Sequence, residues 1–181
     1  MDYLYSSFLT ALQLISHLDS EVLTAVGTSL YTSSTAILLA ALLGTPFGLW
    51  LGLSRFRGRR FLVPLLNALM ALPTVVVGLF LFGLLSRQGP LGSMGLLFTP
   101  YAMILGQLVL ATPIVANLVL AAVAGADKRI LPTLMTLGAT PLQTVLQLLN
   151  EIRYGIMAAV IAGFGRVIAE VGVAMMLGGN I

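Results

Sequence analysis

Long apolar runs alternate with short polar segments along the sequence. Apolar residues dominate four runs, at about residues 22–53, 61–85, 100–124 and 155–177. An α-helix of about 20 apolar residues crosses a hydrocarbon core of about 30 Å, so each run is long enough to span a membrane. The runs lack the apolar and polar alternation that marks the strands of a membrane barrel. The pattern therefore predicts an all-α, polytopic membrane helical bundle with four spans.

The first 21 residues follow a different pattern, in which apolar residues recur at helical spacing before two acidic residues. The apolar positions are Leu4, Phe8, Leu12 and Ile15, and the acids are Asp19 and Glu21. Amphipathic segments of this kind lie in the membrane interface. We expect a short interfacial helix at residues 1–21 on the outer surface, and a disordered tail is the alternative.

Composition and charge indicate a membrane protein and its topology. Hydrophobic residues make up 59% of the chain and charged residues 8%, whereas about a quarter of residues are charged in soluble domains. Seven of the nine Lys and Arg residues lie after the first and the third runs: Arg55, Arg57, Arg59, Arg60, Lys128, Arg129 and Arg153. Under the positive-inside rule these segments are cytoplasmic and the N-terminus lies outside.

The polar segment at residues 126–154 predicts two short cytoplasmic helices divided at Gly138. Pro132 suits the first turn of the first helix. Thr140, Pro141 and Gln143 have the spacing of a capping box that begins the second helix. Apolar residues then recur at i, i+3, i+4, i+7 and i+10, at Leu142, Val145, Leu146, Leu149 and Ile152. This stripe is expected to anchor one side of the segment to the rest of the protein.

Arg166 and Glu170 are two opposite charges within the fourth run. They lie four residues apart, so a helix places them on one face, where they can pair. Each charge alone at the bilayer centre costs about 2.5–3.5 kcal/mol on insertion scales, so both are expected to face the protein or water. Two roles remain open: a part of a transport pathway or gate, or an ion pair that only holds two helices in register.

Catalytic and metal-binding motifs are absent from the sequence. The chain has no cysteine and one histidine, His17, and it contains no His-Glu-x-x-His or Gly-x-Ser-x-Gly motif. The phosphate-binding pattern Gly-x-x-x-x-Gly-Lys-Ser/Thr is also absent. We therefore expect no enzymatic activity, no metal site and no cofactor on this chain.

Two motifs carry a resemblance to a known family. Thr136-Leu-Gly-Ala-Thr-Pro141 resembles the cytoplasmic loop by which permeases of ABC importers dock onto their ATPase, and Gly138 matches the central glycine of that loop. Pro132-Thr-Leu134 and Asn150-Glu151 depart from the family pattern. Gly165-Arg-Val-Ile-Ala-Glu-Val-Gly172 and Gly178-Gly-Asn180 look like a pattern found in molybdate, sulfate and tungstate permeases, and residues 151–166 are most similar to tungstate permeases.

The resemblance implies an ABC importer permease fold (MetI-like) over residues 22–181 and a function in importing an oxyanion, most specifically tungstate. It implies a homodimer in a bacterial inner membrane or archaeal cell membrane, an extracytoplasmic substrate-binding protein, and an ATPase partner that holds ATP and Mg. It also implies a further span after residue 181. The residues expected to couple to the ATPase are Thr136, Gly138, Ala139, Thr140, Pro141 and Leu142, and those of the pathway or gate are Arg166 and Glu170. The alternatives are molybdate or sulfate import, a secondary transporter or channel subunit, and a scaffold without transport.

Overall fold

The computed structural model describes residues 5, 7 and 20–179, and these form helices with no strand among them. The elements are α2 (Ser20–Leu53), α3 (Arg59–Met70), α4 (Thr74–Leu85), the 3-10 helix η1 (Gly92–Met94), α5 (Pro100–Gly125), α6 (Ile130–Thr136), α7 (Pro141–Glu151), α8 (Arg153–Ile168) and α9 (Val171–Gly178). The predicted all-α class is confirmed. The predicted interfacial helix at residues 1–21 lies almost wholly outside the described residues.

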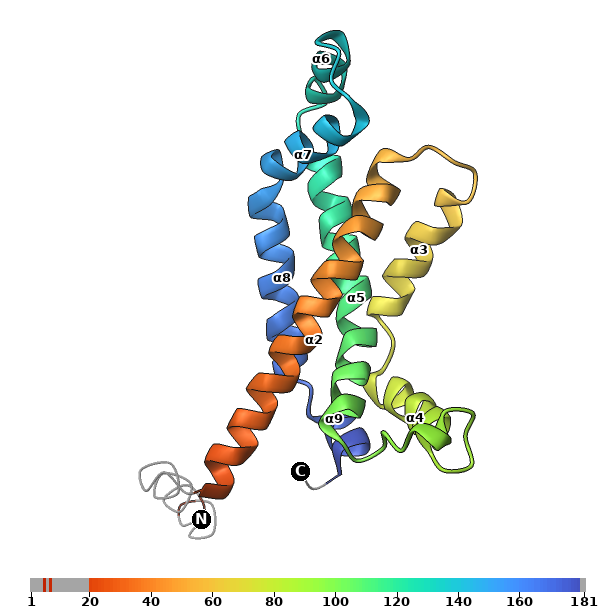
Figure 1. The fold of residues 1–181 in the computed structure, drawn as a ribbon, viewed down its shortest axis with the longest axis vertical. Coiled ribbons are helices and arrows are strands. Elements are labelled where there is room, and N and C mark those ends of the chain that lie inside the picture. The colour runs from red at the N-terminus through yellow and green to blue at the C-terminus, as the bar shows by residue number, and fades with distance from the viewer. Residues whose placement is uncertain (1–4, 6, 8–19, 180–181) are drawn as a thin grey trace.

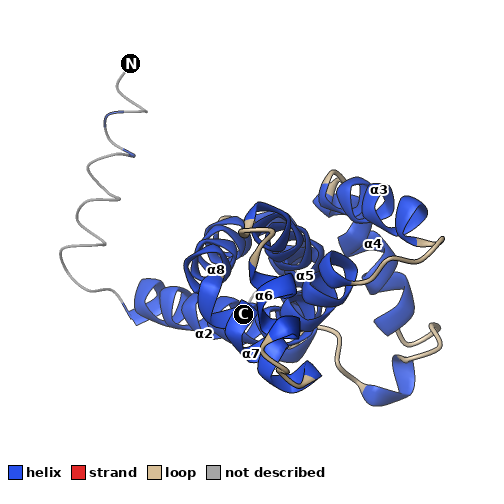
Figure 2. Cartoon of the chain, turned by 90° about the horizontal axis from the view of Figure 1, so that it is seen from above, coloured by secondary structure: helices blue, strands red, loops and turns tan. Residues whose placement is uncertain are grey.

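The two longest helices, α2 and α5, form the centre of the molecule. With 34 and 26 residues, they measure about 51 and 39 Å at about 1.5 Å per residue, so both exceed a core of about 30 Å. A buried apolar cluster joins them to α8 and includes Ile37, Val115, Val119, Ala159 and Val167. Figure 2 shows α2, α5 and α8 gathered together, with α3 and α4 to one side.

A row of glycines lets α2 approach α5 closely. Gly44, Gly48 and Gly52 lie four residues apart on one face of α2. A Cβ at Gly44 would lie 3.1 Å from the backbone nitrogen of Ala116, one at Gly48 would overlap the Ala116 carbonyl oxygen, and one at Gly52 would lie 2.7 Å from Val123. Small residues at helix contacts allow this approach in membrane proteins. The α2–α5 contact therefore depends on the absence of side chains at these positions.

The stretch at residues 61–85 contains two helices, α3 and α4, that meet at an angle of 96°. Pro73 lies at the break and precedes α4. Because proline has no N–H and disfavours a helical conformation in the residue before it, α3 ends at Met70. α3 packs against α5, where Asn117 Nδ2 donates a hydrogen bond to Asn67 Oδ1 at 2.6 Å.

The stretch at residues 155–177 is also divided, into α8 and α9. The helical conformation ends at Ile168, and Glu170 has an extended backbone that begins α9. α9 then packs against α4 and α5 instead of continuing along α2. By length and composition, the described helices provide two membrane spans, or four if the pairs α3–α4 and α7–α8 each count as one bent span.

The two basic segments lie at the same end of the molecule. Figure 1 shows the loop between α2 and α3, together with α6 and α7, at one end, and the start of α2 and α9 at the other. At the basic end, Arg59 Nε donates to the carbonyl oxygen of Leu51 at 2.9 Å, and Trp50 stacks on Phe56 with ring centroids 4.9 Å apart. The clustering that the positive-inside argument requires is therefore present in the fold.

Candidate transport pathway and partner-docking segment

The α6–α7 segment turns sharply at Gly138, as the sequence predicts. Gly138 has a φ of +72°, a conformation that favours glycine. Its N–H donates to Met135 and the N–H of Ala139 donates to the carbonyl of Leu134. These two bonds form a Schellman motif, which satisfies the last carbonyls of α6 and stops the helix.

The predicted capping box at the start of α7 is confirmed. The backbone N–H of Gln143 donates to Thr140 Oγ1 at 3.4 Å, and Gln143 Oε1 accepts from the backbone N–H of Thr140 at 2.8 Å. Pro141 occupies the first turn, where its missing N–H leaves no bond unmade. Two local devices, one on each side of Ala139, therefore fix the shape of the segment.

The buried face of α7 differs from the predicted stripe. Leu148 and Ile152 are 2% and 5% exposed, whereas Leu142 and Leu146 are 69% and 56% exposed. The prediction that Leu142 and Leu146 anchor the segment is therefore wrong. The reason is that α7 begins beyond the end of the bundle (Figure 1), so its first turns lie near α6 alone, and the first residue of α7 in the buried core is Leu148.

Four exposed apolar side chains lie along the segment from the end of α6 to the middle of α7. We call this group the apolar tip, and its members are Met135, Leu137, Leu142 and Leu146. Of the residues predicted to couple to an ATPase, Thr136, Gly138, Thr140, Pro141 and Leu142 are exposed, and Ala139 is half-buried. The α6–α7 segment that bears these side chains lies at one end of the molecule (Figure 1), and apolar side chains left exposed there are available for contact with another protein.

The Arg166–Glu170 pair forms across the break between α8 and α9. Arg166 Nη1 lies 2.8 Å from Glu170 Oε2, and the arginine side chain is 46% exposed while the glutamate is 8% exposed. The predicted pairing is confirmed, although the two residues do not share one helix, since α8 ends before Glu170. The pair links the end of α8 to the start of α9. Its carboxylate is buried and its guanidinium reaches the surface.

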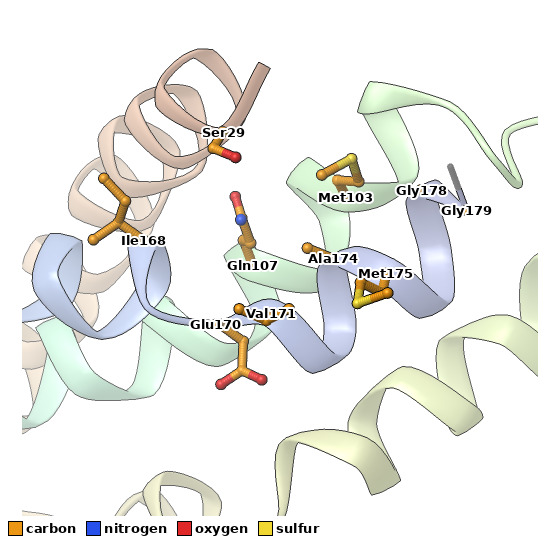
Figure 3. Close-up of a pocket in the computed structure, with 10 residues that line it drawn as sticks. All are labelled: Ser29, Met103, Gln107, Ile168, Glu170, Val171, Ala174, Met175, Gly178 and Gly179. Carbon is orange, nitrogen blue, oxygen red and sulfur yellow. The ribbon is translucent and has the colours of Figure 1, made fainter. Parts of the chain in front are cut away.

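A pocket of about 160 Å³ opens beside this break, between α2, α5, α8 and α9. Its polar side chains are Ser29, Gln107 and Glu170, and its apolar wall includes Met103, Ile168 and Met175. Figure 3 shows the Gln107 amide pointing toward Ser29 on α2, and the Glu170 carboxylate pointing away from Gln107. The polar groups that face one another across the pocket are therefore uncharged.

Gln107 is the residue of this pocket that sequence reasoning missed. Its side chain is 2% exposed. Its Nε2 donates to Ser33 Oγ at 3.3 Å, while its Oε1 is buried and has no hydrogen-bond partner in the described structure. An unpaired buried polar atom costs about 1–3 kcal/mol. The sequence did carry a signal, because Gln107 and Asn117 are the two amide side chains in the apolar run at residues 100–124, and polar residues at membrane depth are rare and often functional.

Among residues 5, 7 and 20–179, no group of three or more His, Asp or Glu side chains is placed to hold a metal ion.

Long apolar helices that are interrupted at a polar pocket are typical of a multi-pass membrane protein that moves a solute. Comparison with known families agrees with this class. Residues 44–181 match the family described as binding-protein-dependent transport system inner membrane component, and the chain belongs to that family. It is thus a membrane component of a transport system, with several helices embedded in the membrane.

Three relatives are similar over most of the chain. The tungstate uptake system permease protein TupB of Campylobacter jejuni is 41% identical over 181 residues, which are all of this chain and 76% of the relative. A protein of the same name from Peptoclostridium acidaminophilum is 38% identical over all of this chain and 79% of its own length. A probable anion ABC transporter permease protein of Haloferax volcanii is 42% identical over 153 residues, or 84% of this chain and 66% of the relative.

Proposed function

We propose that the chain is the permease subunit of an ATP-driven importer that moves tungstate into the cytoplasm by alternating access. Two relatives that match the whole chain at 41% and 38% identity are tungstate uptake permeases, which supports this substrate. Membership of a binding-protein-dependent transport family supports an ATPase and a substrate-binding protein as partners. ATP and Mg are bound by the ATPase, and the permease carries out no covalent chemistry.

The observation that carries the proposal is the apolar tip at the basic end of the molecule. Leu137 and Leu142 are 76% and 69% exposed, and they belong to the α6–α7 segment. Figure 1 shows this segment at one end of the molecule. Hydrophobic side chains exposed to water at the end of a membrane protein are stabilised by contact with a partner. The arginine-rich loop lies at the same end, so the positive-inside rule places the tip in the cytoplasm, where an ATPase can reach it.

The contacts of α7 provide a route from the ATPase to the bundle. Closure of the ATPase pushes on the tip, and α7 passes this motion to α8, which follows it at an angle of 64°. α8 packs on both α2 and α5 through buried residues such as Ala159 and Val167. A push on α7 therefore moves the central helices as a unit and opens the pathway alternately to each side.

The pathway in this proposal lies between two copies of the chain. The Arg166 guanidinium is partly exposed on a single chain, and a second copy would cover it. Because Glu170 is buried and paired with Arg166, the pair contributes little net charge and acts as a gate that opens when α8 and α9 separate. In the structural alternative, the pair only holds α8 and α9 together.

Uptake by the reconstituted complex tests the proposal. The permease, its ATPase and its substrate-binding protein are placed in vesicles, and accumulated tungsten is measured by mass spectrometry with ATP or a non-hydrolysable analogue. We expect tungsten to accumulate with ATP but not with the analogue. Excess molybdate or sulfate should reduce tungstate uptake only weakly. Uptake that continues without ATP under an ion gradient would instead establish a secondary transporter, and absence of flux for all three anions would remove the transport function.

The same assay separates the two roles of the ion pair. If the pair is a gate, Arg166→Ala and Glu170→Ala should each reduce uptake at least about tenfold, because Arg166→Ala leaves the buried Glu170 carboxylate unpaired and Glu170→Ala removes the contact that joins α8 to α9. The charge-swapped double variant keeps the pair and should recover part of the activity. Full uptake in all three variants would leave the pair with a structural role at most.

A further inference from the structure

We propose that the pocket between α2, α5, α8 and α9 is an oxyanion-binding site built from uncharged hydrogen-bond donors, with Gln107 as its central residue. The inference rests on the proposed function, since it gives the transported anion a place where it is held within each copy of the chain. Under the proposed topology the pocket lies in the outer half of the membrane, because Gln107 is seven residues from the outer end of α5, or about 10 Å along the helix.

The unpartnered end of the Gln107 amide is the first observation. A glutamine amide carries one acceptor and two donors, and it nearly keeps its shape when it turns over. In the structure Nε2 bonds to Ser33 and Oε1 is buried without a partner. After a half-turn the Ser33 hydroxyl can donate to the oxygen, and the NH₂ group faces the Ser29 side of the pocket. A bound anion would then accept a hydrogen bond from the NH₂ group, so both ends of the amide would have a partner.

The remaining lining of the pocket suits a small anion. Ser29 provides a hydroxyl donor on the opposite wall. α9 starts at the pocket with Val171, and no side chain caps its first N–H groups. Free N–H groups at the start of a helix attract anions, so they add donors to the amide and the hydroxyl. The pocket measures about 160 Å³, roughly ten times what one water molecule needs.

The charges around the pocket explain why binding there is weak enough for transport. The carboxylate of Glu170 points away from Gln107 and is paired with Arg166. A tetrahedral oxyanion in the pocket therefore meets neutral donors, without an unpaired positive charge to trap it. Transport requires a site that binds well enough to admit the ion and weakly enough to release it. A wholly apolar wall would offer no hydrogen bonds to offset the free-energy cost of removing the anion from water.

Two substitutions test the site in the full complex with tungstate as the probe. Gln107→Met keeps the volume and removes the amide, and Ser29→Ala removes the hydroxyl. Since hydrogen bonds to an ion contribute substantially, we expect ATP-driven uptake to fall roughly tenfold or more for Gln107→Met, and less for Ser29→Ala. The matched controls are Gln88→Met in the loop after α4 and Ser34→Ala on α2, both exposed and outside the pocket.

The readouts distinguish this site from its alternatives. Gln107→Met removes the unsatisfied Oε1 together with the hydrogen bond to Ser33, so the two effects oppose each other and its melting temperature in detergent should change little. Its complex should still hydrolyse ATP. Uptake equal to that of Gln88→Met would overturn the site while the proposed function stands, whereas failure of the unaltered complex to import tungstate removes the proposed function itself. If Gln107→Met does not fold, the comparison of Ser29→Ala with Ser34→Ala tests the site instead. Equal tungstate uptake by these two variants would overturn the site.

Discussion

Single glycines decide how closely α2 and α5 approach each other. Gly48 faces the backbone of Ala116, where an added Cβ would meet a carbonyl oxygen that cannot move away easily. Gly27 lies on the same helix with nothing within 4 Å of an added Cβ. The sequence shows both residues, but it does not show which of them faces another helix. The difference depends on tertiary packing and became visible in the structure.

The contrast predicts opposite effects of one chemical change. Gly48→Ala should lower the stability of the permease by about 1–3 kcal/mol, because overpacking forces α2 and α5 apart. Gly27→Ala should leave stability unchanged or raise it by up to about 1 kcal/mol, since alanine favours the helix. Thermal unfolding of the two variants in the same detergent measures the difference. Equal melting temperatures would show that the close α2–α5 contact is not required.

The end of α6 and the start of α7 were more predictable from the sequence than the buried face of α7. The turn at Gly138 and the capping box at Thr140 follow from local chemistry, and the structure contains both. The exposure of one face of α7 does not follow from local chemistry. A stripe of apolar residues at helical spacing shows that a face is apolar, but it does not show which part of the protein covers that face. The breaks before α4 and α9 were also not predicted as breaks. Pro73 was a local signal for the first, whereas Glu170 gave no comparable signal for the second.

The two faces of α7 predict two different kinds of defect. Leu146 belongs to the apolar tip, so Leu146→Asp should fold normally and reduce binding of the ATPase by about tenfold or more. Leu148 is 2% exposed, so Leu148→Ala should lower stability by about 2–5 kcal/mol through the cavity it leaves. Co-purification of the ATPase and thermal unfolding are measured for both variants. Normal ATPase binding by a folded Leu146→Asp permease would contradict a docking role for the tip.

At the scale of the whole molecule, charge and hydropathy predicted more than any single motif. The runs of apolar residues gave the all-α class, and the basic segments that are far apart in sequence lie at one end of the fold. Local patterns could not predict the pocket, because Ser29, Gln107 and Val171 come from three helices that meet only in the folded chain.

The proposed topology places α6 and α7 in the cytoplasm and η1 outside, and labelling of single cysteines tests it most directly. The chain has no cysteine, so Thr136→Cys in α6 and Ser93→Cys in η1 each create one unique thiol at an exposed position. With a membrane-impermeant maleimide, we predict that Ser93→Cys is labelled in intact cells and Thr136→Cys only after permeabilisation. Labelling of Thr136→Cys, but not of Ser93→Cys, in intact cells would invert the topology and remove the ATPase-docking role of the apolar tip.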